Sequence, residues 1–576
     1  MLKLYRRYLK PYSASIAAIL ALVFAGVMAD LYLHTLMSDI IDLGVMNGDT
    51  AYILRIGGLM LLVAAGSLLA AAVSSYLSAR AATLFGRDLR RAIFARVEGF
   101  SLDEFDRLGT ATLITRTTND VTQVQNVTVM ILRMVVMAPI MAAGGIVMAY
   151  QKDRPLTLTL AVAVPVLAAA VTLLASKAMP WFRVMQAKID RLNLVLREGL
   201  TGIRVIRAFN RGPREEARFD EANRDITDTF IKVNRMMAFM MPTVMVIMNL
   251  TSISILWFGV RRIDAGGMQM GSLMAFTQYA MQIMFSFVMM SIMFIMVPRA
   301  QAAADRISEV LATEPSIVDP ADPLVPAESS GEVEFRDVSF SYHGAERPAL
   351  QGVSFVARRG EVTAVVGSTG SGKSTLAKLV PRFYDVDAGE VLVDGVDVRR
   401  MRQDELRRRI GYVPQKALLF SGTVAENIGF GLDSYEEGEL REAAEIAQAA
   451  DFVEGFDGKY SHRIAQGGAD VSGGQKQRLS IARALARKPG IYIFDDTFSA
   501  LDFKTDAKLR AALKRRVEGA TVLLVAQRIG TVMDADRIVV LDDGRVAGVG
   551  RHAELLATCP VYREIAASQL SEEELA

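Results

Sequence analysis

The residues best suited to chemistry in this chain form one glycine-rich loop. This loop follows a strand-like run at 361–366 and opens a helical pattern at Lys373, which is the context of a P-loop. Glycines let backbone N–H groups turn inward around phosphate oxygens, and the helix start adds partial positive charge. Lys373 is placed to reach the β- and γ-phosphates, and the Ser374 hydroxyl to ligate Mg²⁺. The predicted phosphate-binding residues are Gly367, Ser368, Thr369, Gly370, Ser371, Gly372, Lys373, Ser374 and Thr375.

A second feature is the apolar run Ile491–Phe494, which ends in the carboxylate of Asp495. A buried strand that ends in an aspartate, downstream of a P-loop, fits a Walker B site, where Asp495 orders the ligands of Mg²⁺. An ordinary strand end is the alternative interpretation. The sequence therefore predicts that Ser374 and Asp495 lie on one metal ion.

A third motif narrows the family. The signature motif of ABC transporters resembles the segment Val471–Gln475 and the following Lys476–Arg478. P-loop enzymes in general do not need this motif. Its serine and glycines offer hydroxyl and backbone donors at a helix start, and these donors suit a γ-phosphate held by another subunit. The residues of this motif that are expected to bind nucleotide are Ser472, Gly473, Gly474 and Gln475.

Other motifs of the ABC family follow in order. The resemblance implies that Tyr342 stacks on adenine, that Gln415 contacts Mg²⁺ and the membrane domain, and that Ser499–Asp502 is the D-loop. Residues 105–120 and 202–210 resemble the cytoplasmic loops of exporter-type ABC proteins. The resemblance covers nearly the whole chain and implies ATP and Mg²⁺ as ligands.

Two positions depart from the family pattern, and both concern hydrolysis. Asp496 stands where the family places a glutamate that polarises the attacking water, and Gln527 replaces its switch histidine. Aspartate is shorter by one methylene, roughly 1.5 Å, whereas a general base must come within about 2.6–3.2 Å of its water. Glutamine donates a hydrogen bond but cannot become a cation. A milder difference is Ala465–Gly468, where many relatives have a glutamate-containing loop.

Together with the intact P-loop and signature, these departures predict a site that holds ATP but hydrolyses it poorly. In the family, two cassettes pair head to tail, and each ATP lies between one P-loop and the other subunit's signature. We therefore expect one subunit of a heterodimer, with its own P-loop in the degenerate site and its signature completing the partner's competent site. A slow homodimer is the alternative.

The elements that position these motifs divide the chain into unlike parts. Residues 331–576 alternate strand and helix patterns with glycine turns, as in an α/β nucleotide-binding domain. A proline-rich linker is expected at 314–330. Residues 1–313 are expected to form a transmembrane domain, because they contain six apolar stretches of spanning length, at about 13–37, 53–79, 127–149, 155–177, 238–260 and 271–298.

Arginine sets the predicted orientation. The arginine-rich segments 80–126 and 178–237 are placed in the cytoplasm by the positive-inside rule, together with both chain termini. Arg261 and Arg262 fall in an outer loop and count against the rule.

The two cytoplasmic segments show apolar residues at helical spacing, which predicts that the membrane helices continue into the cytoplasm. Breaks at Leu108–Thr110 and Asn210–Pro213 predict a short transverse element at each tip, able to press on another domain. At the N-terminus, residues 2–10 are expected to form a basic helix at the membrane surface that ends at Pro11.

Composition excludes some classes of protein. Of the 576 residues, 51% are hydrophobic, which is high for a soluble protein and low for one that lies wholly in the membrane. The formal net charge of +2 gives no reason to expect nucleic acid as a partner. Cys559 is the only cysteine, so the chain has no internal disulfide and no cysteine-based metal site.

Two features of the membrane half are candidate substrate contacts. Asp30 and His34 share one helix face inside the first span, and ionisable groups there favour a functional role, unless the face reaches the outer interface. Methionines suit an adaptable cavity, but helix packing or lipid contact also explains them. They are Met236, Met237, Met240, Met241, Met245 and Met248, and Met281, Met284, Met289, Met290, Met293 and Met296.

The predicted architecture is a multidomain membrane protein, in which a six-helix transmembrane bundle with long cytoplasmic helix extensions precedes an α/β P-loop nucleotide-binding domain. The predicted function is ATP-driven transport, with export as the expected direction, in a bacterial plasma membrane. The expected partners are a second half-transporter, membrane lipid and a transported substrate. A regulatory nucleotide-sensing subunit and an importer with an exporter-like fold are alternatives, and the sequence does not name the substrate.

Overall fold

The computed structural model describes residues 1–326, 331–516 and 519–570. The chain divides into two compact units, Met1–Glu98 with Ala111–Thr313 and Gly99–Thr110 with Glu314–Ala576. The domain bounds expected from the sequence remain predictions, and the last residues of the expected linker, 327–330, lie outside the described residues.

The first unit consists of helices. Six helical stretches among the described residues are long and apolar enough to cross a membrane, which confirms the six predicted spans. The helices are α1 (Leu2–Leu4), α2 (Ser13–Asp39), α3 (Thr50–Glu98), α5 (Thr110–Thr115), α6 (Val121–Met130), α7 (Val136–Lys152), α8 (Arg154–Thr201), α9 (Ile203–Ala208), α10 (Gly212–Ala238), α11 (Met240–Asp264) and α12 (Met270–Ala312).

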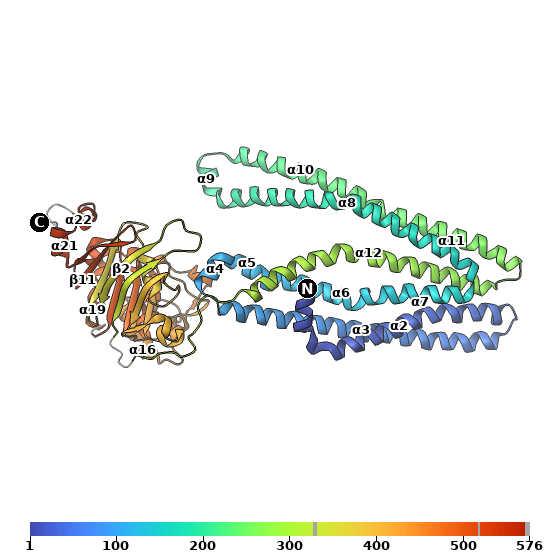
Figure 1. Ribbon diagram of the computed structural model, residues 1–576, viewed down its shortest axis with the longest axis horizontal. Coiled ribbons are helices and arrows are strands. Elements are labelled where there is room, and N and C mark those ends of the chain that lie inside the picture. Colours follow the sequence, from blue (N-terminus) through green and yellow to red (C-terminus); the bar gives the residue numbers. More distant parts are fainter. Residues whose placement is uncertain (327–330, 517–518, 571–576) are drawn as a thin grey trace. The chain divides into compact units, whose positions relative to one another are not determined.

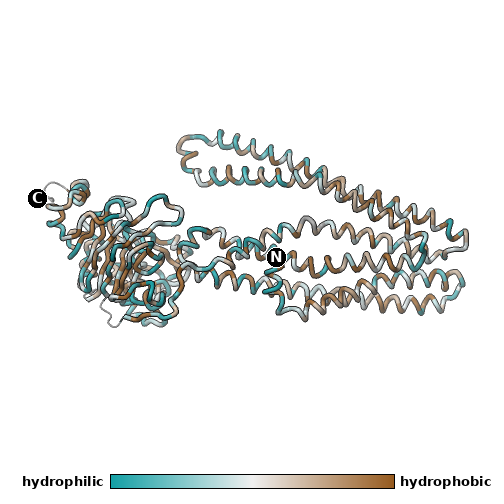
Figure 2. Tube along the Cα trace, viewed as in Figure 1, coloured by the Kyte–Doolittle hydropathy of each residue, from teal (hydrophilic) through white to brown (hydrophobic). Residues whose placement is uncertain are grey.

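Two groups of helices are visible within this unit (Figure 1). Helix α2 packs on α3, α7 and α12, whereas α8 runs alongside α10 and α11. Apolar side chains such as Ile19, Leu31 and Phe276 are fully buried in the first group. Figure 2 shows hydrophobic residues along the middle of the long helices and more hydrophilic residues towards α9 and α10. This distribution is typical of helices that cross a membrane and continue into water.

The N-terminal segment is helical, as predicted, but it does not end at Pro11. A 3₁₀ turn at Lys10–Tyr12 carries the chain from the first helical residues into α2. Proline lacks an N–H group and has a helical φ, so it is tolerated in the first turn of a helix. Pro11 therefore lies in a 3₁₀ turn that leads into α2, and the helical path continues past it.

An ion pair accounts for one of the two arginines that opposed the positive-inside rule. The Arg262 guanidinium donates to Asp153 Oδ2 at 3.1 and 3.2 Å, and the Asp153 side chain is only 2% exposed. Asp153 Oδ1 also accepts from the backbone N–H of Leu156 at the start of α8. The charge of Arg262 is thus matched locally, which reduces its weight as an orientation signal.

Both predicted breaks are present, and each follows a short helix. Helix α4 (Leu102–Leu108) ends at Gly109, whose φ of +75° favours glycine. Helix α9 is followed by a turn through Asn210, whose φ is +51°. Within α9, which the structure describes in full, no side chain is buried, and the adjacent Phe209 is 73% exposed.

The second unit is built on β-sheets covered by helices. A four-stranded sheet has the order β2-β1-β4-β5, a six-stranded sheet the order β12-β11-β3-β10-β9-β6, and β7 pairs with β8. The strands are β1 (Val333–Phe340), β2 (Leu350–Ala357), β3 (Val362–Gly367), β4 (Ala388–Val393), β5 (Val396–Asp397), β6 (Ile410–Val413), β7 (Gly422–Thr423), β8 (Arg463–Ile464), β9 (Ile491–Asp495), β10 (Thr521–Val525), β11 (Arg537–Asp542) and β12 (Arg545–Gly550).

The second unit also contains eleven α-helices among its described residues. They are α4, α13 (Lys373–Leu379), α14 (Gln403–Arg408), α15 (Val424–Ile428), α16 (Glu437–Ile446), α17 (Ala450–Glu454), α18 (Gly473–Ala486), α19 (Phe503–Arg516), α20 (Ile529–Val532), α21 (His552–Thr558) and α22 (Pro560–Ala567). This architecture confirms the predicted α/β domain.

The six-stranded sheet aligns the ends of its parallel strands. In the register, Val525 at the end of β10 is opposite Val365 of β3 and Asp495 of β9, and β6 runs parallel to β9. The segments that follow β3, β6, β9 and β10 therefore leave the sheet at one edge, where α/β proteins commonly bind ligands. The four strand ends carry four of the predicted motifs to that edge.

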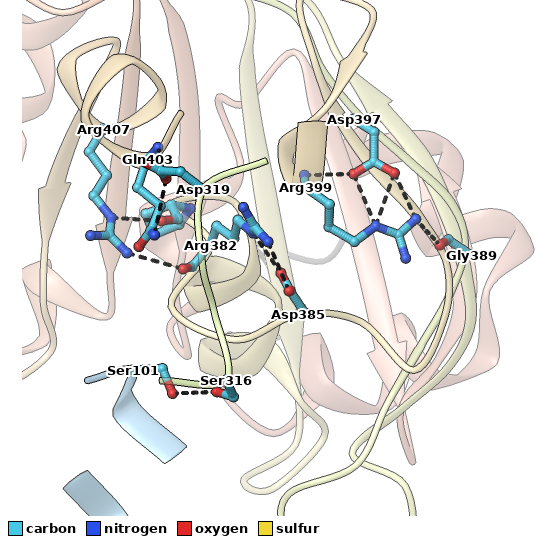
Figure 3. A network of polar contacts seen from close by, with 11 residues as sticks. Ser101, Ser316, Asp319, Arg382, Asp385, Gly389, Asp397, Arg399, Gln403 and Arg407 are labelled. Atoms are coloured by element: carbon cyan, nitrogen blue, oxygen red, sulfur yellow. Dashed lines mark hydrogen bonds and ion pairs between the residues drawn. The ribbon is translucent and has the colours of Figure 1, made fainter. Parts of the chain in front are cut away.

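Helix α4 belongs to the second unit because its first turn is tied to the chain after α12. A capping box joins Ser101 and Glu104, and the Glu104 carboxylate also accepts from the backbone N–H of Ser316 at 3.1 Å. The Ser101 and Ser316 hydroxyls share a hydrogen bond of 2.9 Å (Figure 3). Glu104 is 3% exposed, so this anchor is shielded from water.

The expected linker is held on the second unit, as far as the structure describes it. Asp319 Oδ1 accepts from the backbone and the side-chain amide of Gln403, as Figure 3 shows. The N–H of Leu324 donates to the carbonyl of Arg400 at 2.8 Å. These bonds give the proline-rich segment a defined path over the α/β unit.

Replacing Glu104 with alanine should loosen α4. Hydrogen bonds from Ser101 and Ser316 outweigh the opposing effect of burial and hold the pKa of Glu104 below its ordinary value. Its stabilising effect is therefore complete above the unfolded pKa, about 4.3, and is lost as the pH falls through the lower folded pKa. We expect amide hydrogen exchange in 101–108 to accelerate about tenfold at pH 7. Asp103→Ala is the control, and equal exchange in both variants would contradict the anchor.

Candidate functional site

The loop between β3 and α13 has the shape of a phosphate cradle. Gly372 has a φ of +95°, and a Cβ there would lie 2.5 Å from the carbonyl oxygen of Ala349, so only glycine fits. The Lys373 ammonium lies inside the loop and donates to the carbonyls of Gly367 at 2.8 Å and Ser368 at 2.6 Å. Its charge is thus positioned where the phosphates of a nucleotide would lie.

The structure brings Ser374 and Asp495 together, as the sequence predicted. The Ser374 hydroxyl donates to Asp495 Oδ1 at 2.7 Å. A hydroxyl and a carboxylate at this distance are oxygen ligands of the kind that Mg²⁺ prefers. Residues 1–326, 331–516 and 519–570 contain no group of three or more His, Cys, Asp and Glu side chains that could hold a metal. A magnesium ion at this point would therefore depend on Ser374, Asp495 and the phosphates.

Asp496 lies between two amide side chains. Its Oδ2 accepts from Gln415 Nε2 at 3.0 Å and from Gln527 Nε2 at 2.9 Å. Its φ of +47° turns the chain sharply after β9. The two positions that depart from the family pattern are therefore in direct contact. Gln415 contacts Asp496 here, and its expected contact with Mg²⁺ stays a prediction.

Burial shifts the charges of this site in opposite directions. Burial lowers the pKa of Lys373, although Asp496 and Asp495 oppose the shift. Burial also raises the pKa of Asp496, and the neighbouring Asp495 adds to that effect, while the hydrogen bond from Gln415 opposes it. Each group loses hydration that a bound nucleotide and its metal would replace with charge interactions.

The signature residues start α18 at the surface of the unit. Ser472 is the N-cap, and its Oγ accepts from the backbone N–H of Gln475, while Gln475 Oε1 accepts from the N–H of Ser472. Ser472 and Gly473 are exposed. A Cβ at Gly474 would lie 3.5 Å from the nearest atom, an ordinary contact. The motif is thus accessible to another subunit, and the space beside Gly474 has room for a Cβ atom.

The aromatic residue expected to meet adenine lies beside the P-loop helix. The hydroxyl of Tyr342 shares a hydrogen bond of 3.0 Å with Thr375. Tyr384 contacts the Tyr342 ring edge to face, with centroids 5.4 Å apart, and donates to Asp106 of α4 at 2.8 Å. Tyr384 therefore joins helix α4 to the expected adenine side of the site.

Tyr384 and Tyr412 also lie at the site, although neither residue was among those predicted from the sequence. Tyr412 donates to Asp495 Oδ2 at 3.3 Å, and both burial and Asp495 raise the pKa of its hydroxyl. The signal for Tyr412 was available, because it lies three residues before Gln415 in a strand-like run. Tyr384 had no comparable signal, since its contact with Asp106 joins residues 278 positions apart.

In the membrane unit, Asp30 and His34 join α2 to neighbouring helices. Asp30 accepts from Ser67 of α3 at 2.5 Å, and His34 Nε2 lies 2.9 Å from the amide nitrogen of Gln282 in α12. The methionines do not share one environment, since Met284 is fully buried and Met245 is 59% exposed. A substrate role for either group stays a prediction.

Comparisons with known proteins identify the family of both halves of the chain. Residues 16–287 match the family described as ABC transporter transmembrane region, and residues 350–499 match the family described as ABC transporter. An uncharacterized ABC transporter ATP-binding protein of Mycobacterium tuberculosis is 45% identical over 573 residues, covering 99% of this chain and 98% of the relative.

More distant relatives cover most of the chain as well. A lipid A-core flippase of Chromobacterium violaceum is 32% identical over 537 residues, with 93% of this chain and 92% of the flippase covered. A solved structure of a bacterial Atm1-family ABC exporter with ATP bound has a TM-score of 0.81 and 26% identity, and the match covers 98% of this chain and 99% of that one.

Asp496→Asn should stabilise the nucleotide-free protein at neutral pH. The raised pKa means that the ionised carboxylate costs stability above the folded pKa, and that this cost disappears below the unfolded pKa, about 3.9. We expect the Tm to rise by about 1–3 °C at pH 7.5, and the difference to shrink as the pH falls towards 4. Thermal unfolding of the solubilised chain measures this difference.

Asp502→Asn is the matched control. Hydrogen bonds from Thr505 hold the pKa of Asp502 below its ordinary value, so removing its charge should not raise the Tm. A similar rise in both variants would show that burial of Asp496 is not the cause.

Proposed function

Because this chain belongs to the ABC transporters, as an exporter-type half-transporter, we propose that it forms one subunit of a heterodimer whose own ATP site holds nucleotide but hydrolyses it slowly. The chain is a multi-pass protein of the bacterial membrane, and its cytoplasmic cassette is an ATPase coupled to transport. In this proposal the partner is a different half-transporter, and the two ATP sites differ in their rates of hydrolysis.

The surroundings of Asp496 are the observation that carries this proposal. A general base needs a free lone pair directed at the attacking water. Oδ2 of Asp496 already accepts from Gln415 and Gln527, and the aspartate side chain is shorter than glutamate by one methylene, roughly 1.5 Å. Gln527 remains neutral, so it cannot add positive charge beside a γ-phosphate as a protonated histidine can. These features favour retention of ATP over its hydrolysis.

The remaining residues support binding. Lys373 is positioned to exchange its bonds to the loop carbonyls of Gly367 and Ser368 for bonds to phosphate oxygens. The Ser374 hydroxyl and the Asp495 carboxylate would hold Mg²⁺, which neutralises phosphate charge when it is bound. Binding and orientation are thus provided, while Oδ2 of the short Asp496 side chain is already occupied by two amide donors.

Two surfaces support assembly with a partner. The exposed start of α18 presents the hydroxyl of Ser472 and free backbone at Gly473, as a site completed in another subunit requires. Helix α9, described in full, has no buried side chain, and Val205 and Phe209 are 61% and 73% exposed. Large apolar side chains that are this exposed, at the turn between α8 and α10, indicate a contact with another protein surface.

The transported substrate is a separate question. A lipid A-core flippase is named among the relatives at 32% identity, so an amphiphilic lipid is one candidate to test for stimulation of ATPase activity. The polar contacts of Asp30 and His34 lie within the bundle that such a molecule would meet.

Restoring the family residues should restore hydrolysis. The chain purified alone should hydrolyse ATP very slowly, and the double variant Asp496→Glu with Gln527→His should raise its steady-state ATPase rate at least about tenfold, since general-base catalysis is typically worth 10²–10⁴-fold. Asp496→Gln with Gln527→His is the control, because it restores the histidine without a carboxylate. Robust ATPase from the unchanged chain would instead favour a homodimer with two competent sites.

The purified pair should respond unequally to changes in this chain. Asp496→Asn should lower its ATPase rate by only about a few-fold, since that site contributes little turnover, whereas Ser472→Ala or Gly474→Asp should lower it by about 10²–10³. A Cβ at Gly474 would make only ordinary contacts, so we expect the Gly474→Asp variant to fold and its loss of activity to reflect the partner's ATP. If Asp496→Asn is the inactive variant instead, this chain carries the hydrolytic site.

A further inference from the structure

Gln569, near the end of the described chain, bonds to the segment that carries Gln527. Its Nε2 donates to the carbonyl of Gln527 at 2.9 Å, and its Oε1 accepts from the N–H of Ile529 at 2.8 Å. One amide thus joins the backbone on both sides of Arg528. The side chain of Arg528, the N-cap residue of α20, does not cap the helix, so Gln569 supplies the acceptor that the first N–H group of the helix needs.

The clamped segment is the one that faces Asp496. The Gln527 amide donates to Asp496 Oδ2 at 2.9 Å. The Arg528 guanidinium donates to the carbonyl of Ser499 at 3.3 Å, and the Ser499 hydroxyl donates to the carbonyl of Asp496 at 2.8 Å. Both side chains therefore reach the turn that begins at Asp496, and a displacement of their backbone would move both contacts together.

The position of Gln569 is itself fixed by packing. In α22, Tyr562 and Ala566 are fully buried in the hydrophobic core that also contains Ile529. The N–H groups of Gln569 and Leu570 both donate to the carbonyl of Ala566, and Leu570 packs against the same core. A side chain on this anchored turn makes a rigid reference point for the segment after β10.

We propose that Gln569 is a positioning residue of the nucleotide site, which holds the backbone of Gln527 so that the Gln527 amide faces Asp496 and the γ-phosphate. Gln569 touches neither nucleotide nor Asp496, so it acts through Gln527. The inference rests on the proposed function, in that ATP is bound beside Asp496. It predicts that the C-terminal turn controls how long this chain retains ATP.

Three variants separate this role from general stability. Gln569→Met keeps the size of the side chain and removes both hydrogen bonds. Gln569→Glu keeps the acceptor for Ile529 but places a second oxygen against the carbonyl of Gln527. Ser568→Ala is the control, because the Ser568 hydroxyl bonds only within its own turn, to the carbonyl of Ile565.

The measurement is the dissociation rate of the fluorescent nucleotide MANT-ATP, with Mg²⁺, from the full-length chain purified alone. In that preparation every nucleotide site is built on this P-loop, and Lys373→Ala identifies the signal. We expect MANT-ATP to leave the Gln569→Met and Gln569→Glu variants on the order of fivefold faster than the unchanged chain. A factor of this size corresponds to the free energy of one typical hydrogen bond. Release from Ser568→Ala should be unchanged.

A double-mutant cycle tests whether Gln569 acts through Gln527. In a Gln527→Ala background, Gln569→Met should no longer change the release rate, whereas loss of a merely structural contact would persist there. An unchanged rate in both Gln569 variants, or the same acceleration in the Gln527→Ala background, would overturn the inference alone. Failure of the unchanged chain to bind MANT-ATP, or binding that Lys373→Ala does not weaken, would overturn both the proposed ATP site and the inference.

Discussion

The site depends on the parallel pairing of β3, β10 and β9. Because Val525 lies opposite both Val365 and Asp495 in the register, the chain leaves each strand at one edge of the sheet, and the Ser374 hydroxyl comes within 2.7 Å of Asp495. A slip of one residue in β9 would turn the Asp495 side chain to the other face. The contact of Ser374 with Asp495, the position of Asp496 and the direction of the Gln527 segment all follow from this one register.

A second constraint is the attachment of helix α4 to this sheet. Helix α4 is part of the α/β unit because buried Glu104 accepts from Ser101 and Ser316, and because Tyr384 donates to Asp106. Tyr384 in turn contacts Tyr342, beside the P-loop helix. A short helix, which lies between two membrane spans in the sequence, is therefore linked through Tyr384 to the expected adenine side of the ATP site.

The third theme is the balance between holding ATP and hydrolysing it. Lys373, Ser374 and Asp495 provide the charge and oxygen ligands that binding needs. At the next position, a short carboxylate is occupied by two neutral amides. The same site thus combines groups suited to binding with a carboxylate of short reach whose Oδ2 is occupied, and Gln569 links the Gln527 segment of this site to the C-terminal turn.

The sequence by itself determined the six spans, the α/β domain and the motif residues, because membrane helices have a length set by the bilayer and P-loop chemistry requires fixed local spacing. It also located Asp496 and Gln527 as departures, without showing that they touch. Contacts such as Gln569 with Gln527, or Tyr384 with Asp106, were decided only by the tertiary structure. These contacts join residues far apart in the chain, where no local periodicity or spacing records which side chains will meet. The passage of the helix through Pro11 was likewise missed, since a proline that stops a helix and one that begins its next turn have the same local sequence signal.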